Sequence, residues 1–435
     1  MINKTPFIQK ICTFFAFYLA VSSVFPPIRT MSGYNVFSII VMFSWIACAF
    51  VAKPTFFTIF AKDPLHKQVV IFFVAYTTIV PYLFGNGIIG NRYLTYGQVL
   101  IFYFIYQYNR TYGYKNSSKT IIKWSVMFII TTSALTLFGL INNPYLSRSI
   151  KSSGEYTTSL QSQGIGGFEF IYFSVFLATT LFFLIINKNS LDLQLHKKIA
   201  IYSLFTLTVF TVIYSNYFTA LIMLTMSLLI LVITKANAVS RIITLIIGAI
   251  VLVQGKSNSI GVINWASNNL SSGKTLDRVL LIQADLMGFG NESLLSGRIP
   301  TFEESWNAFL NNPFFGIALN KIEFDDGYLK GFGQHSHFLD TFALYGLFIG
   351  LIGIYIIAQP FLKRMKVHTA LFGLNVSILA SVLMLFSANN VTPSIGYAVF
   401  FIYPVLYDWQ VDRTKAKTKE NEKEIREKAS ESIAS

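Results

Sequence analysis

A ladder of apolar runs constrains the fold of this chain more than any other feature of its sequence. Segments rich in Leu, Ile, Val and Phe recur almost from end to end, and mostly short polar loops separate them. A membrane-spanning helix needs about 20 predominantly apolar residues, or somewhat fewer. Runs of about this length lie at 8–25, 35–52, 68–84, 93–108, 124–141, 168–186, 199–214, 217–233, 241–255, 338–358, 370–387 and 394–409.

The composition points to the same class of protein. Hydrophobic residues make up 53% of the 435 residues and charged residues only 12%, whereas charged residues make up about 25% of a typical soluble protein. A soluble fold of this composition would expose large apolar patches. We therefore expect an all-α polytopic membrane protein with about 12 transmembrane helices.

The basic character of the chain reflects topology. A net charge of +14 is also typical of nucleic-acid-binding proteins, but the basic residues alternate between loops. Apart from the tail and the one long loop, the N-terminus and the loops after even-numbered runs carry about four times as many Lys and Arg as the others. The positive-inside rule then places both termini in the cytoplasm and the long loop outside. No nucleic-acid partner is expected.

This topology divides the chain into four parts. Residues 1–255 are expected to form transmembrane helices 1–9, 256–337 a long extracytoplasmic loop, 338–411 helices 10–12, and 412–435 a charged cytoplasmic tail. Apolar periodicity predicts two short amphipathic helices in the loop, one over 276–287 and one after Gly297 that ends at Asn311-Asn312-Pro313. The apolar face of the second helix is predicted to contain Ile299, Phe302, Trp306, Phe309 and Leu310. These helices would lie on the membrane surface or cap the bundle.

The polar residues that could carry chemistry lie outside the apolar runs. Glu169, at the start of one run, comes nearest to an ionisable group inside the membrane, whereas an ion-coupled transporter normally needs several. Arg298 is predicted in the first turn of its helix, where free amides and a guanidinium favour a phosphate. Arg148, in a Ser-rich outer loop, would supply a second guanidinium to the same phosphate. The alternative is a surface ion pair or a lipid headgroup contact for each Arg, and an ordinary flexible loop for the Ser-rich stretch.

Two histidines precede the run at 338–358. His335 lies directly before the membrane, where an imidazole can act as a general base near neutral pH. His337 is two residues further on, and a metal site would need a third or fourth ligand, which no recognisable spacing supplies. Cys12 and Cys48 lie in apolar runs and are expected to be packing residues. We therefore expect no metal and no other cofactor.

The order of these motifs resembles a known family. Ser296-Gly297-Arg298 is followed by a helix containing Trp306, then by NPFFG (312–316), then by H-S-x-x-L from His335, with Gly346 eleven residues after that histidine. This order is similar to the shared C-terminal region of bacterial O-antigen polymerases and O-antigen ligases. The stretches SRSIKSSGEY and SQGIGGFEFIY, within 147–172, are similar to an outer loop of Wzy-type polymerases. One departure is Ser336, where many relatives have Asn.

The resemblance implies a function in the bacterial inner membrane. It implies a GT-C type glycosyltransferase that joins undecaprenyl-diphosphate-linked repeat units of an O-antigen or capsule by inverting, metal-independent transfer. Arg148 and Arg298 would hold the diphosphate and His335 would activate the acceptor hydroxyl. The further residues expected to contribute to substrate binding are Arg92, Lys151, Arg278 and His337. The expected partners are the lipid-linked donor and acceptor, membrane lipid, and chain-length regulator and flippase proteins.

Two alternatives stay open. The same residues would serve an O-antigen ligase, which transfers the finished glycan to a lipid A core or another acceptor. A flippase or transporter for these glycans is the other alternative, although the sparse intramembrane charge and the long outer loop count against it.

Overall fold

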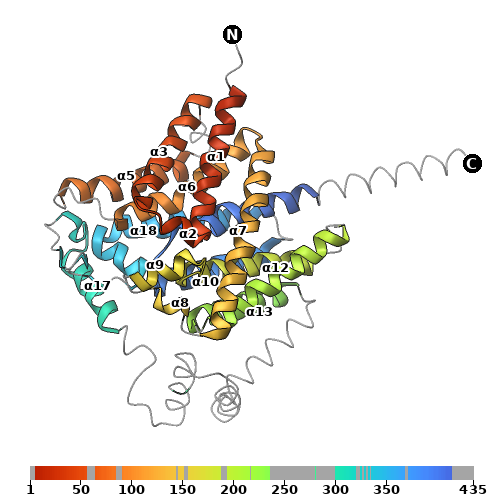
Figure 1. Ribbon diagram of the computed structural model, residues 1–435. Coiled ribbons are helices and arrows are strands. Elements are labelled where there is room, and N and C mark those ends of the chain that lie inside the picture. The colour runs from red at the N-terminus through yellow and green to blue at the C-terminus, as the bar shows by residue number, and fades with distance from the viewer. Residues whose placement is uncertain are drawn as a thin grey trace, which may run out of the picture.

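The apolar runs form helices that pack into a bundle in the computed structural model of the protein (Figure 1). The structure describes residues 5–55, 64–84, 91–143, 146–150, 155–187, 194–215, 217–235, 280, 299–319, 324–325, 328–329, 332–333, 335–367 and 371–413. The expected helix at 241–255, the expected amphipathic helix at 276–287 apart from Leu280, and most of the expected tail lie outside these residues.

The helices of the first half follow the expected runs. They are α1 (Thr5–Val24), α2 (Pro26–Arg29), α3 (Tyr34–Ala52), α5 (Pro64–Phe84), α6 (Asn91–Thr111), α7 (Lys115–Asn142), α8 (Leu146–Ser149), α9 (Glu155–Ser162), α10 (Phe168–Ile186), α12 (Leu195–Tyr214) and α13 (Phe218–Lys235). The short helices α2, α8 and α9 lie at the ends of long helices, where they shape the connections.

The second half is less regular. Its elements are α17 (Ile299–Asn311), the 3₁₀ helix η2 (Ile317–Leu319), strands β1 (Phe324–Asp325) and β2 (Tyr328–Leu329), α18 (His337–Val367), α19 (Phe372–Ala388), α20 (Pro393–Tyr397) and the π-helix η4 (Ala398–Ile402). The two strands pair antiparallel, with Phe324 opposite Leu329. Residues 403–413 continue as helix.

Six of the described helices are long and apolar enough to cross a membrane. These segments are Phe7–Val24, Tyr34–Ala52, Lys115–Asn142, Phe168–Ile186, Leu195–Tyr214 and His337–Lys366. Helices satisfy their own backbone hydrogen bonds, so they are suited to a solvent that offers no partners. The expectation of a helical membrane protein is therefore confirmed at this level.

Helix α10 occupies the centre of the bundle. Its apolar span, Phe168–Ile186, is 78% buried, and α12, α13, α19 and α20 pack around it. Its sequence is apolar on every side, as expected for a helix that neighbours surround completely. Small polar residues bring other helices together: Ser377 Oγ donates to the carbonyl oxygen of Ser227 over 2.8 Å between α13 and α19. Such short side chains allow helix backbones to approach closely within a membrane.

Candidate functional site

A serine fixes the beginning of α18 between the two predicted histidines. Ser336 Oγ accepts a hydrogen bond from the Leu339 amide over 3.3 Å, and its carbonyl oxygen accepts one from the Asp340 amide over 2.8 Å. This is the geometry of an N-cap, a position that Ser and Asn fill about equally well. Ser336 can therefore do the capping work that Asn would do in this position.

The two histidines have different surroundings. His335 is half-buried in a bend before the helix, whereas His337 is only 9% exposed. The His337 ring lies between Tyr96 (ring centroids 4.7 Å apart) and Phe386 (5.1 Å). Its Nε2 has no hydrogen-bond partner among the described residues. His335 is thus the more exposed of the two histidines, and His337 is packed as part of the bundle.

A buried carboxylate holds α17 against α18. Ser305 of α17 is 1% exposed and donates from Oγ to Asp340 Oδ1 over 2.7 Å. The Gly333 amide donates to the same hydroxyl over 2.8 Å. A Cβ atom at Gly333 would lie 1.6 Å from the carbonyl oxygen of Thr301, so only glycine fits this approach. Asp340 is not among the predicted site residues, although an acid in the first turn of an apolar helix is a signal that the sequence contains.

Helix α17 forms where it was expected, but part of its predicted apolar face points outward. The inward side includes Ser305 and Ala308, whereas Trp306 and Leu310 are exposed. The carboxylate of Asp340 gives Ser305 a partner inside the protein, and exposure to lipid would carry no penalty for an apolar side chain. Phe314 and Phe315 extend this exposed apolar surface beyond the end of the helix.

The backbone of the NPFFG segment (312–316) packs directly against Gly346. Gly346 has φ 76°, which interrupts α18, and a Cβ atom there would lie 2.2 Å from the carbonyl oxygen of Phe314. The Leu347 amide donates to the carbonyl oxygen of Pro313 over 2.7 Å. Gly316 has φ 66° and packs equally closely on the Leu344 backbone. The expected helix at 338–358 is therefore broken where this turn approaches it.

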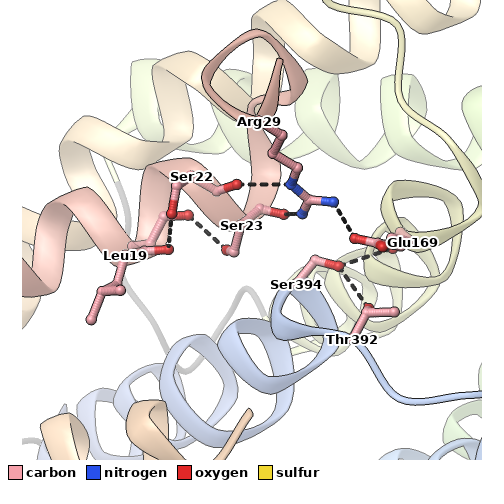
Figure 2. A network of polar contacts seen from close by, with 8 residues as sticks. Leu19, Ser22, Ser23, Arg29, Glu169, Thr392 and Ser394 are labelled. Atoms are coloured by element: carbon pink, nitrogen blue, oxygen red, sulfur yellow. Dashed lines mark hydrogen bonds and ion pairs between the residues drawn. The ribbon is translucent and has the colours of Figure 1, made fainter. Parts of the chain in front are cut away.

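An ion pair joins α2 to the beginning of α10 (Figure 2). The Arg29 guanidinium contacts the Glu169 carboxylate and the carbonyl oxygens of Ser22 and Ser23, and the two charged side chains are 18% and 26% exposed. Burial by itself lowers the pKa of Arg29, but Glu169 and Tyr34 outweigh it and the net pKa is raised. Arg29 therefore has a structural role, because its guanidinium is held by these contacts within the protein.

The segment after α19 connects this ion pair to the histidines. The His337 amide lies 3.4 Å from the carbonyl oxygen of Asn389, whose side-chain amide donates to Tyr172 Oη of α10 over 3.1 Å. Further along the segment, Ser394 Oγ donates to the Glu169 carbonyl oxygen over 3.3 Å. The beginnings of α10 and α18 thus lie at the same end of the bundle.

Residues 147–150 contact the turn that precedes α10. Ser147 Oγ donates to the carbonyl oxygen of Gly166 over 2.8 Å, and a Cβ atom at Gly167 would lie 2.9 Å from Ile150. Helix α8, which contains the backbone of Arg148, therefore lies beside the turn that begins α10.

A chain of contacts continues from α8 to His337. Tyr217 Oη donates to the carbonyl oxygen of Ser147 over 3.1 Å, and the rings of Tyr217 and Tyr172 lie 6.2 Å apart. Tyr172 Oη accepts a hydrogen bond from the side chain of Asn389. The carbonyl oxygen of Asn389 in turn accepts one from the His337 amide. Regions almost 200 residues apart in the sequence are connected at one end of the molecule.

The remaining predicted site residues are only partly described. The backbone of Arg92 lies in the first turn of α6 and that of Arg148 in α8, while Lys151, Arg278 and Arg298 lie outside the described residues. The predicted arginine clamp therefore stays a prediction. Among the described residues, no three His, Cys, Asp or Glu side chains gather as metal ligands.

These features define a helical membrane protein with polar residues gathered where the long helices α10 and α18 begin. Comparisons with protein-family models, with curated proteins and with solved structures gave no significant match.

Proposed function

We propose that the protein is a membrane glycosyltransferase, a polymerase that joins undecaprenyl-diphosphate-linked repeat units of an O-antigen or capsule. The contact chain from Ser147 through Tyr217, Tyr172 and Asn389 to His337 carries the proposal. An active site made of an arginine from one outer loop and a histidine from another requires these loops to meet. In this topology, 12 transmembrane helices with both termini in the cytoplasm present the site at the extracytoplasmic face of a bacterial inner membrane.

His335 would act as the general base. It accepts the proton of an acceptor sugar hydroxyl, whose oxygen then attacks the anomeric carbon of the donor. The bond from that carbon to the diphosphate oxygen breaks, and the configuration at the carbon inverts. Arg148 and Arg298 neutralise the negative charge that grows on the leaving diphosphate, which is the electrostatic stabilisation that such a reaction needs most.

The surface of α17 suits a lipid-linked substrate. Exposed apolar side chains lie on α17 and directly after it: Trp306, Leu310, Phe314 and Phe315. Ser305 of the same helix is hydrogen-bonded to Asp340 in the first turn of α18. An amphipathic segment with such a face partitions into the boundary between headgroups and acyl chains. A polyprenyl tail would pass this face while its diphosphate remains at the polar helix ends.

Deletion of the gene tests the proposal, with the surface glycan separated on a gel. A single repeat unit on its normal acceptor is the result expected for a polymerase. Full-length polymer that accumulates on the lipid without attachment would identify a ligase, and complete glycans trapped on the cytoplasmic side would identify a flippase. Either of the last two results overturns the proposal.

A further inference from the structure

A cavity lies at the other end of the bundle. It has a volume of about 830 Å³ and lies between α6, α7, α10, α12 and residues 402–413. The C-terminal part of α18 is close by, because Arg364 stacks on Tyr106, which lines the cavity. His337 begins α18 and His335 lies just before it, at the opposite end of that helix, so this cavity is separate from the site described above.

The mouth of the cavity is strongly basic. Its lining contains the cations Arg110, Lys115, Lys119, Lys123, Lys197 and Arg413 but only two acids, Asp408 and Asp412. Both acids are already engaged: Asp412 pairs with Lys115 over 2.6 Å, and Asp408 lies 3.5 Å from Arg110. Over the described ranges, no carboxylate pairs with Lys119, Lys123 or Lys197.

The inner part of the cavity is apolar. Ile122, Val126, Ile129 and Ile130 of α7 face Leu177, Leu181 and Leu184 of α10 and Ile201 and Leu204 of α12. From Lys115 to Ile130 the lining follows α7 for about 22 Å, at 1.5 Å per residue. One membrane leaflet contributes about 15 Å, half of the roughly 30 Å hydrocarbon core. The cavity is therefore long enough for a lipid chain that enters from one leaflet.

The row of lysines on α7 is electrostatically unfavourable unless an anion is bound beside it. Lys115, Lys119 and Lys123 follow one another at intervals of four residues, an arrangement in which like charges repel. They also begin in the first turn of the helix, where the dipole disfavours cations. Lys197 occupies the first turn of α12. Two helix N-termini thus add positive potential near Lys119, Lys123 and Lys197, for which the described residues offer no carboxylate partner.

We propose that this cavity binds an anionic phospholipid of the membrane. The phosphate lies between Lys119, Lys123 and Lys197, and one acyl chain lies along Val126, Ile130 and Ile201. Lysines that only set the orientation of the protein could point anywhere in the interface, whereas these surround an apolar cavity. The binding site does not depend on the glycosyl transfer proposed above.

The test is native mass spectrometry of the full chain, purified and delipidated in detergent. Phosphatidylglycerol is compared with phosphatidylcholine of the same acyl chains. We expect a retained phosphatidylglycerol molecule, and about 30-fold weaker binding in the Lys119→Gln/Lys197→Gln variant. The matched control, Lys10→Gln/Lys198→Gln, removes two charges from residues outside the cavity lining and should bind like the unmodified protein.

A second pair of variants tests the apolar part. Ala200→Trp places an indole into the cavity and should displace the lipid, whereas Ile199→Trp, on the neighbouring exposed position of α12, should not. Equal retention of both lipids would overturn the proposal, as would unchanged binding in both cavity variants. Inorganic phosphate that protects the protein from thermal unfolding as well as the lipid does would also overturn it, since the site would then recognise a small anion.

Discussion

Ser305 Oγ lies 2.7 Å from Asp340 Oδ1 and donates a hydrogen bond to it, which joins a short amphipathic helix to the first turn of a long apolar helix. Both residues are buried, with Asp340 only 7% exposed. The Gly333 amide reaches the same hydroxyl, so three separate segments meet at Ser305. This contact fixes where α17 lies relative to His335.

Ser305→Ala should therefore loosen α17. The substitution removes the hydrogen bonds that Ser305 makes with the Asp340 carboxylate and the Gly333 amide, and losing a hydrogen bond to a charged group costs about 1–3 kcal/mol. We expect a lower midpoint of thermal unfolding in detergent and reduced polymer synthesis. Asn307→Ala, on the exposed side of the same helix, is the control. Equal behaviour of the two variants would show that the hydrogen bond does not hold the helix.

Gly346→Ala should be among the most damaging small substitutions in the chain. The positive φ is strained for any residue with a Cβ atom, and that atom would collide with backbone at 2.2 Å. We expect little folded protein by size-exclusion chromatography. The matched control is Gly97→Ala, whose Cβ atom would meet nothing closer than 3.9 Å and should change stability by about 1 kcal/mol or less. Normal yield of Gly346→Ala would contradict the proposed fit between the NPFFG turn and α18.

The two histidines should respond differently to substitution. His335→Ala removes the proposed general base and should abolish polymer, while His337→Phe keeps a ring between Tyr96 and Phe386 and should retain a substantial part of the activity. Gel analysis of the surface glycan in complemented deletion strains measures both. The opposite ranking would transfer the chemical role to His337 and its unpartnered Nε2.

The Arg29–Glu169 pair should show measurable coupling. The residues share one contact and are both less than a third exposed, so a double-mutant cycle with Arg29→Met and Glu169→Gln should give about 0.5–3 kcal/mol of interaction free energy. The exposed pair Lys115–Asp412, with 62% and 53% exposure, is the comparison and should give about 0–1 kcal/mol. Unfolding in mixed micelles measures both cycles, and equal coupling would show that the pair near α10 is not structural.

Arg148→Ala and Arg298→Ala should each abolish polymer without affecting membrane insertion. Each substitution removes a guanidinium that the proposed mechanism needs to neutralise the leaving diphosphate, so a loss of about 100-fold or more is expected. Immunoblots of membrane fractions report insertion, and glycan gels report polymer. Normal chain lengths, or a strict requirement of the purified protein for a divalent metal, would contradict the arginine mechanism.

Much of the fold could be predicted because it depends on local properties. Most of the described long helices coincide with apolar runs, although α7 begins at Lys115, before the run at 124–141, and α18 continues to Val367, beyond the run at 338–358. Helix α17 ends before Pro313 as its sequence predicts. The orientation of α17 could not be predicted in this way. The apolar periodicity placed Trp306 and Leu310 on an apolar face but left open whether that face meets the membrane or the bundle. In the structure both are exposed, and the buried Asp340 of another helix pairs with Ser305 on the inward side.

The sequence by itself determined that this is a helical membrane protein and which residues are polar enough to carry chemistry, because hydropathy and charge are properties of each segment alone. Only the tertiary structure decided that α8 and α18 are connected through Tyr217, Tyr172 and Asn389, that Gly346 receives the NPFFG turn, and that a basic cavity lies at the opposite end. The physical reason is that these features depend on contacts between segments far apart in the chain. Packing around α10 fixes those contacts, and no local pattern encodes them.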